Sequence, residues 1–328
     1  MNYRSIDDLS RTISLHLHEV PQDTEIVVGI PRSGMLPASI IALKLNIPLT
    51  DIHSFIRNDE LKTGSTRNYK LKKLSRPADA RKILLVDDSV ASGSSMKEAI
   101  KLLSEFTERG GAVVTLAIYA ERAHRTCVDK HFEVVNQPRM FEWNIMHHPR
   151  LSEACLDIDG VLCVDPGEDE NDDGRNYLHF VQNARPLVIP TTEVKHLVTS
   201  RLEKYRKPTE EWLSRNGVRY RTLHMLDLPT AEERRRLNMH HKFKASIYGS
   251  DPEATLFIES EPEQAKEIML ATGKPVYCTA DNLLYTPQMS IRSTTAKVRH
   301  FSSSLIQRSQ RKIKNYLSRA FNSLRSHQ

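Results

Sequence analysis

The sequence has few cysteines and no long apolar run. The four cysteines form no CxxC pair and have no spacing typical of zinc, so we expect free thiols in a reducing compartment; they are Cys127, Cys155, Cys163 and Cys278. No stretch approaches the ~18–20 apolar residues of a transmembrane helix. The first residues, MNYRSIDDLS, lack the charged-then-apolar pattern of a signal peptide. These absences predict a cytoplasmic protein.

Acidic residues are missing from the last segment, residues 290–328, which holds nine Lys or Arg. The net charge of +6 comes from this tail, because the rest of the chain carries 38 basic and 41 acidic residues, a net −3. The negative net charge of the chain outside this tail argues against a uniformly basic nucleic-acid binder. Apolar residues recur near helical spacing within the tail, so we expect a basic amphipathic helix that contacts the inner face of the membrane peripherally. A helix packed on the body, a nucleic-acid contact and a solvated end remain open.

Strand and helix patterns alternate along the remaining chain. A chain of 328 residues usually forms two domains, and alternation of this kind indicates an α/β fold with mainly parallel sheets. We therefore expect two Rossmann-like domains, residues 1–150 and 151–289, followed by the basic helical tail 290–328. Early elements are a helix over 5–19, a strand over 25–30, a helix through 45 and a strand over 51–56.

Residues 82–95, KILLVDDSVASGSS, combine an apolar strand, an acid pair and a small-residue turn before a helix. The free N–H groups of such a turn and of the helix N-terminus bind anions. Asp87 and Asp88 beside an anion site suit a ligand with a phosphate at one end and hydroxyl groups next to it. A ribose 5-phosphate fits this description.

A second strand–loop–helix unit carries Pro31-Arg32-Ser33-Gly34 in its loop, which suits another anion. The long polar segment 57–81 is rich in Lys and Arg. Its composition is consistent with a lid over the ligand or with a solvated loop. Trp143, His147 and His148 are candidates for a hood over the acceptor.

These segments resemble the ribose-phosphate and pyrophosphate loops of type I phosphoribosyltransferases, whose donor is phosphoribosyl pyrophosphate (PRPP). The resemblance implies that Asp87 and Asp88 hold the ribose hydroxyls and that Arg32, Ser33 and Gly34 bind the pyrophosphate. The 5′-phosphate would be bound by the small-residue loop, Ala91, Ser92, Gly93, Ser94 and Ser95.

A second acidic site follows another apolar run, in Ala154-Cys155-Leu156-Asp157-Ile158-Asp159-Gly160. Alternation places Asp157 and Asp159 on the same side of the strand end. One can act as a nucleophile and the other as a proton donor if their surroundings separate their pKa values. Paired carboxylates also attract Mg²⁺, a hard cation that prefers oxygen ligands.

Three later segments complete a pattern that resembles the four motifs of haloacid dehalogenase-like phosphatases. A strand over 195–200 ends in hydroxyl groups, a helical segment carries two lysines, and a strand over 255–258 ends in an acid. The resemblance implies Asp157 as nucleophile, Asp159 as acid/base, and Mg²⁺ held by Asp157, Asp159 and Glu259. Phosphate would be bound by Thr199, Ser200 and either Lys244 or Lys242. Glu259 stands where the family usually has Asp.

The two resemblances together are similar to dual-domain ribofuranosyltransferases of bacterial surface-polysaccharide assembly. They imply that 5-phosphoribosyl passes from PRPP to a glycan, which we expect to be attached to a carrier lipid, and that the 5-phosphate is then removed. Two alternatives stay open: a nucleobase phosphoribosyltransferase fused to a nucleotidase, and a non-catalytic PRPP sensor that binds nucleic acid. The acceptor sugar, the anomer and the oligomeric state are not indicated by the sequence.

Overall fold

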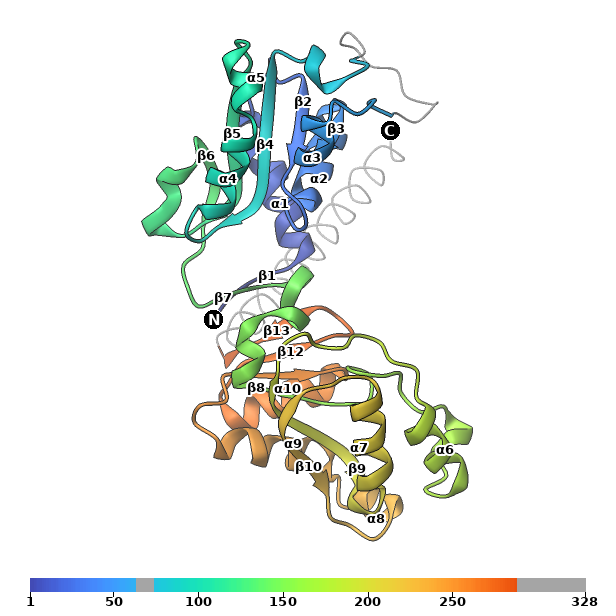
Figure 1. The fold of residues 1–328 in the computed structure, drawn as a ribbon. Coiled ribbons are helices and arrows are strands. Elements are labelled where there is room, and N and C mark those ends of the chain that lie inside the picture. The colour runs from blue at the N-terminus through green and yellow to red at the C-terminus, as the bar shows by residue number, and fades with distance from the viewer. Residues whose placement is uncertain (63–73, 288–328) are drawn as a thin grey trace, which may run out of the picture. The chain divides into compact units, whose positions relative to one another are not determined.

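The chain folds as two units that divide between Ile145 and Met146 (Figure 1). The computed structural model describes residues 1–62 and 74–287. Each unit has a mainly parallel sheet of its own, so the predicted α/β class with two sheet domains is confirmed. The tail 290–328, and the part of the predicted basic loop within 63–73, lie outside the described residues.

The first unit is built on a five-stranded sheet in the order β3-β2-β4-β5-β6. All four strand pairs are parallel. The central strands read as continuous apolar runs because helices cover both of their faces. The strands are β2 (Ile26–Gly29), β3 (Leu49–Asp51), β4 (Lys82–Val90), β5 (Ala112–Ala120) and β6 (Lys130–Val134). A separate parallel pair joins β1 (Asn2–Arg4) to β7 (Arg139–Phe141).

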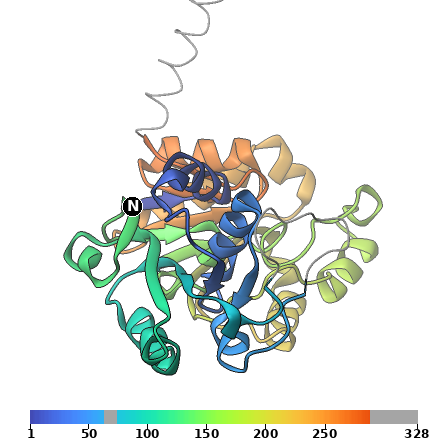
Figure 2. The same cartoon turned by 90° about the horizontal axis from the view of Figure 1, so that it is seen from above.

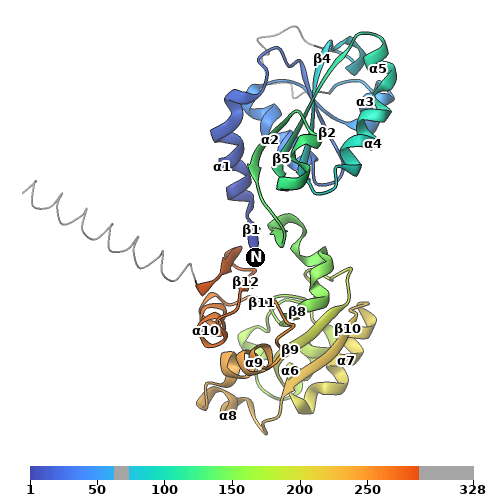
Figure 3. The same cartoon turned by 90° about the vertical axis from the view of Figure 1, so that its left-hand side faces the viewer.

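Helices cover the two faces of this sheet, with α1 and α2 on one side and α3, α4 and α5 on the other (Figure 3). Helix α1 begins after Ser5, whose side chain forms a capping box with Asp8, and it buries Leu9 and Ile13. The pair α4 and α5 runs almost without a break (teal in Figures 1 and 2). The helices are α1 (Ile6–His16), α2 (Met35–Leu45), α3 (Ile52–Ile56), α4 (Ser94–Leu102) and α5 (Ser104–Glu108).

The predicted strand over 51–56 is wrong. The strand β3 ends at Asp51, whose carboxylate accepts hydrogen bonds from the N–H groups of His53 and Ser54 at 2.9 and 3.0 Å. This side-chain cap starts helix α3. The β-favouring residues Ile52, Phe55 and Ile56 suggested a strand, but the cap decides the local structure.

The second unit has a six-stranded sheet in the order β10-β9-β8-β11-β12-β13. Only the pairing of β12 with β13 is antiparallel among the pairs of this sheet in the described residues. The strands are β8 (Ala154–Leu156), β9 (Val194–Leu202), β10 (Tyr220–Leu226), β11 (Leu256–Glu259), β12 (Val276–Cys278) and β13 (Leu283–Tyr285). Strands β8, β9 and β11 are adjacent, so the segments that follow them meet at one edge.

Helices also cover this second sheet. Ala245, Tyr248, Ile268 and Met269, from α9 and α10, pack with Phe257 in one core. Figure 3 shows α7 on the opposite side from α10. The helices are α6 (Arg175–Asn183), α7 (Arg206–Arg215), α8 (Ala231–Arg236), α9 (Met239–Ser250) and α10 (Pro262–Thr272). Within the described ranges, no helix has the length and apolar character needed to cross a bilayer.

Candidate active sites

The acid pair of the first unit lies inside strand β4, and both side chains are buried. The N–H of Asp88 donates to Oδ1 of Asp87 at 2.9 Å. Burial, and then the charge of Asp88, raises the pKa of Asp87 to about 8. The Asp87 carboxyl is therefore mostly protonated at neutral pH and can both donate and accept hydrogen bonds. Such a group suits a ligand hydroxyl.

Asp88 joins this strand to two other parts of the first unit. Its Oδ1 accepts a hydrogen bond from Oγ of Ser33 at 3.1 Å, and its Oδ2 accepts one from Nε1 of Trp143 at 2.7 Å. Trp143 stacks on Phe141 with 4.8 Å between ring centroids. Of the three proposed hood residues, Trp143 thus lies at the acid pair. His147 contacts Thr191 instead, and His148 accepts from the N–H of Arg150.

The loop with Arg32 and Ser33 packs tightly against β4 at Gly34. A Cβ at this position would lie 2.5 Å from the carbonyl oxygen of Ile30, 2.8 Å from that of Val86 and 2.9 Å from Oδ1 of Asp87. Only glycine fits there without a shift of the loop. The Arg32 side chain is exposed, and the Pro31–Arg32 peptide bond is cis.

The small-residue loop leads directly from β4 into helix α4. Gly93 has φ +78°, and a Cβ there would lie 2.9 Å from Cβ of Cys127, so the turn requires glycine. The hydroxyl groups of Ser92 and Ser94 are 2.9 Å apart. Their exposed side chains, with those of Ala91 and Ser95, flank the free N–H groups of the first helical turn.

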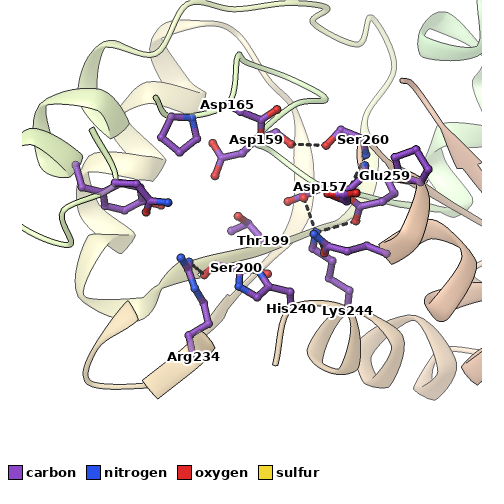
Figure 4. A pocket seen from close by; sticks show the side chains of 16 residues that line it. Asp157, Asp159, Asp165, Thr199, Ser200, Arg234, His240, Lys244, Glu259 and Ser260 are labelled. Atoms are coloured by element: carbon purple, nitrogen blue, oxygen red, sulfur yellow. Dashed lines mark hydrogen bonds and ion pairs between the residues drawn. The ribbon is translucent and has the colours of Figure 1, made fainter. Parts of the chain in front are cut away.

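The second site is a cavity of about 440 Å³ at the edge where β8, β9 and β11 end (Figure 4). Lys244, from α9, is only 2% exposed, and its Nζ lies 2.6 Å from Oδ2 of Asp157 and 2.7 Å from Oε2 of Glu259. It also donates to Oε1 of Gln264 at 3.0 Å. The two carboxylates raise the pKa of Lys244 above its ordinary value, against the effect of burial. Lys244 is therefore a cation.

Asp157, which accepts from Lys244, is also buried. Burial raises its pKa to about 7, with Lys244 acting against this rise and Glu259 and Asp159 adding to it. Its Oδ1 accepts from the N–H of Ile158 at 2.7 Å. Because that oxygen is fixed by backbone, Oδ2 is the oxygen directed toward Lys244.

Asp159 has a different partner from the one its spacing suggests. Its carboxylate is bound by Arg201 of β9, with Nη2 2.6 Å from Oδ1 and Nε 3.1 Å from Oδ2. Arg201 is fully buried and also contacts Cys163 and Thr209. A proton-donor role for Asp159 thus requires that Arg201 release one of its oxygens. Sequence reasoning missed Arg201, which directly follows the predicted strand 195–200, because arginine is usually exposed.

Some of the remaining predicted residues of this site line the cavity, and one does not. Thr199 and Ser200 line the cavity together with Lys244. Lys242 does not: its side chain is exposed, and its Nζ lies 3.5 Å from the carbonyl oxygen of Leu237. Sequence reasoning also missed Gln264 and Arg234, which line the same cavity.

The donor set fits a hard cation only in part. Among the described residues, no three His, Cys, Asp or Glu side chains are grouped so that they could hold a metal ion. Asp157 and Glu259 do supply two neighbouring carboxylates, and Mg²⁺ commonly binds one or two carboxylates while it keeps several waters. Asp157 and Glu259 would hold it once Lys244 releases an oxygen of each. The Asp159 carboxylate is bound by Arg201 in the same way.

Comparison with known proteins concerns the first unit. Residues 2–149 match the model of the phosphoribosyl transferase domain. Xanthine-guanine phosphoribosyltransferase of Chromohalobacter salexigens is 29% identical over 147 residues, 43% of this chain and 82% of that protein. Transcriptional regulator GfcR of Methanocella arvoryzae is 26% identical over 107 residues, 32% of this chain. The chain thus spans 50% of the length of that regulator.

A solved structure shows a weaker likeness. Xanthine-guanine-hypoxanthine phosphoribosyltransferase of Helicobacter pylori is 16% identical, with a TM-score of 0.33, and the match covers 44% of this chain and 92% of that chain. The assignment depends instead on the family match, which includes both the Arg32–Gly34 loop and the acid pair before the small-residue loop. Residues 2–149 of this chain are a phosphoribosyltransferase domain of type I.

Proposed function

We propose that the protein transfers 5-phosphoribosyl from PRPP to a glycan and then removes the 5-phosphate, which leaves a ribofuranosyl residue in a surface polysaccharide. The observation that carries this proposal is the presence of two sites in one chain. The first is the buried pair Asp87–Asp88 with Ser33 in a phosphoribosyltransferase domain. The second is Lys244 between Asp157 and Glu259 in a separate unit.

In the first reaction, the bond between ribose C1 and the pyrophosphate oxygen breaks, and a bond from C1 to the acceptor hydroxyl oxygen forms. The hydroxyl proton leaves to solvent. The acid pair would hold the ribose hydroxyls and stabilise the positive charge that develops on the ring. The N–H groups near Arg32–Gly34 would bind the departing pyrophosphate, and those of Ala91–Ser95 the 5′-phosphate.

In the second reaction, which we assign to residues 151–289, a carboxylate oxygen of Asp157 attacks phosphorus and the bond from phosphorus to O5′ breaks. Asp159, after Arg201 has released one of its oxygens, supplies the proton to O5′. Water then attacks the aspartyl phosphate, gives a proton to Asp159 and releases inorganic phosphate. Lys244 and Thr199 would balance the charge on the phosphoryl oxygens. Mg²⁺, when bound, would neutralise further phosphate charge.

The glycan acceptor follows from the order of the two reactions. A nucleotide pathway has little use for a phosphate that is removed directly after transfer, whereas an unphosphorylated riboside is a finished glycan unit. Residues 290–328, with nine basic and no acidic residues, would hold the enzyme at the membrane surface where lipid-linked glycans are assembled.

The curated relatives favour two other candidate functions. One relative is named a nucleobase phosphoribosyltransferase, which would suit a base as acceptor and a nucleotidase as second unit. Another is named a transcriptional regulator, which would suit a PRPP sensor without turnover. The sensor predicts salt-dependent nucleic-acid binding.

The test is incubation of the protein with PRPP and Mg²⁺, with either free nucleobases or synthetic oligosaccharides of the O-antigen type, followed by mass spectrometry. We expect the oligosaccharide to gain phosphoribose and then to lose the phosphate. Turnover of a base without turnover of any oligosaccharide would replace the glycan by the nucleobase. Nucleic-acid binding without turnover would favour the sensor.

Variants assign each step to its site. Asp157→Asn should stop the reaction at the phosphorylated oligosaccharide, and Asp87→Ala with Asp88→Ala should abolish transfer. The matched control is Asp169→Asn, an exposed acid of the second unit outside the cavity, which should behave as wild type. Complete dephosphorylation by Asp157→Asn would contradict the assigned nucleophile.

A further inference from the structure

The cavity of the second unit contains a buried cation that the two proposed reactions do not use. Arg234, on helix α8, is 7% exposed, and its Nη1 donates to the carbonyl oxygen of Ser200 at 2.6 Å. Its Nε has no hydrogen-bond partner within the described ranges, and no ion pair to a carboxylate is formed by Arg234 there. A buried guanidinium without an anion is costly, because its charge has lost water and gained no counter-charge.

The other basic side chains of this cavity are already neutralised. The charge of Lys244 is compensated by Asp157 and Glu259. Burial, and then the neighbouring charges of Arg234 and Lys244, lowers the pKa of His240 to about 4, so its imidazole is neutral at pH 7. Of the three basic side chains that line the cavity, Arg234 therefore carries the uncompensated charge.

A second unpartnered donor lies beside it. Ser200 is 8% exposed, and its Oγ is buried and has no hydrogen-bond partner in the described part of the chain. Figure 4 shows Ser200 and the end of the Arg234 side chain next to each other, on the other side of Thr199 from Asp157. Arg234 and Ser200 thus both line the cavity of about 440 Å³, and each has one buried donor atom, Nε of Arg234 and Oγ of Ser200, without a partner in the described residues.

We propose that Arg234 and Ser200 bind an oxyanion of the phosphate class in this cavity, and that Arg234 is a recognition residue of the second unit. The forked guanidinium donors and an added hydroxyl match the oxygens of a phosphate. The identification of this anion as part of a substrate rests on the proposed phosphatase function, whereas the binding itself does not. The oxyanion is either the phosphoryl group beside Asp157 or a second acidic group of the same molecule.

The experiment measures the binding of inorganic phosphate to the full chain by isothermal calorimetry. Arg234→Gln should raise the dissociation constant at this site at least about tenfold, and Ser200→Ala about threefold or more, because hydrogen bonds to charged groups are the strong ones. The control is Arg235→Gln, the exposed neighbour on the same helix. The phosphate loop of the first unit binds equally in every variant, so the difference from wild type is the readout.

Comparison with Thr199→Ala identifies the source of the oxyanion. If Arg234 and Thr199 share one phosphate, both variants weaken the same binding event and their effects are not additive. If Arg234 instead binds a second acidic group, Arg234→Gln and Thr199→Ala each weaken the binding of a different phosphate ion. A dissociation constant within twofold of wild type for both Arg234→Gln and Ser200→Ala overturns the proposal.

Two further measurements, of thermal stability and of phosphatase activity, distinguish a loss of phosphate binding from a folding defect and from failure of the proposed function. Without phosphate, Arg234→Gln should unfold near the wild-type temperature, because the lost hydrogen bond to the Ser200 carbonyl is offset by the removal of a buried charge without a counter-charge. Phosphate should protect this variant less than wild type. Lowered stability with unchanged protection by phosphate would make Arg234 merely structural and overturn the proposal. If Arg234→Gln does not fold, Ser200→Ala alone decides. If the wild-type protein hydrolyses no phosphomonoester while Arg234→Gln still loses phosphate binding, that result would refute the proposed phosphatase activity and support the proposed binding site.

Discussion

The Asp87 carboxyl keeps a proton that an exposed aspartate loses far below neutral pH. Its pKa is about 8 because it is buried and because Asp88 is its neighbour. In the unfolded chain the pKa of the same group is the ordinary aspartate value of 3.8. Between these two values the unfolded chain has released the proton while the folded chain retains it, so the folded state loses stability as pH rises from about 4 to about 8.

Asp87→Asn removes this dependence, because an amide cannot ionise and can still accept from the N–H of Asp88. We expect the free energy of unfolding of the variant, relative to wild type, to rise by on the order of 3 kcal/mol between pH 5 and pH 8 and to level off above. Urea denaturation across this range measures it. Glu108→Gln, an exposed control, should give a flat difference. A difference for Asp87→Asn that shrinks with rising pH would contradict the raised pKa.

Single residues also show where sequence reasoning ends. The acid pair and the DxDG motif could be located because each follows an apolar strand run. The choice between Lys242 and Lys244 could not be made, since residues two apart on a helix face different sides and only the packing of α9 decides which side meets Asp157. Arg201 and Arg234 were missed because arginine is usually exposed, and their burial depends on contacts distant in sequence.

At the scale of elements, each of the two turns that we propose to bind phosphate in the first unit depends on one glycine. Gly93 needs a positive φ, but Gly34 has φ −63°, which any residue adopts, so space alone requires glycine there. The order of strands and helices could be predicted from alternation. The short α3 could not be predicted, because a single cap at Asp51 overrides the strand preference of Ile52, Phe55 and Ile56.

Gly34→Ala should push the Arg32–Ser33 loop away from β4. We expect a loss of about 1–3 kcal/mol in unfolding free energy from overpacking and at least about tenfold weaker PRPP binding. Fluorescence of Trp143, which donates to Asp88, reports the binding. The chain has two tryptophans, and Trp212 is buried in the second unit. Gly249→Ala is the control, since its nearest contact would be an ordinary 3.6 Å. Wild-type PRPP affinity in Gly34→Ala would contradict the described packing.

At the scale of the whole molecule, each unit has its own sheet, core and acidic site. The residues described for the acid pair all belong to the first unit, and those described for the second site all belong to the second unit. The two-domain plan could be predicted from length and repeated strand–acid–turn patterns. The boundary falls between Ile145 and Met146, near the proposed division at 150.

Because the two sites belong to separate units, we expect two variants that each lack one step to complement each other. A mixture of Asp157→Asn with the double variant Asp87→Ala, Asp88→Ala should yield the dephosphorylated riboside, because one chain makes the phosphorylated glycan and the other hydrolyses it. Time-resolved mass spectrometry should show the phosphorylated intermediate before the product. Accumulation of that intermediate without any dephosphorylation in the mixture would show that it does not pass between chains.

The buried pairing of Arg201 with Asp159 also bears on how this sequence can change over evolution. Arg201 is fully buried and directs its charge at one carboxylate. Replacing Asp159 alone leaves the buried charge of Arg201 without a counter-charge, whereas replacing both residues with neutral groups removes this cost. Positions 159 and 201 should therefore vary together among descendants of this fold, and a lineage that loses Asp159 should lose the arginine as well.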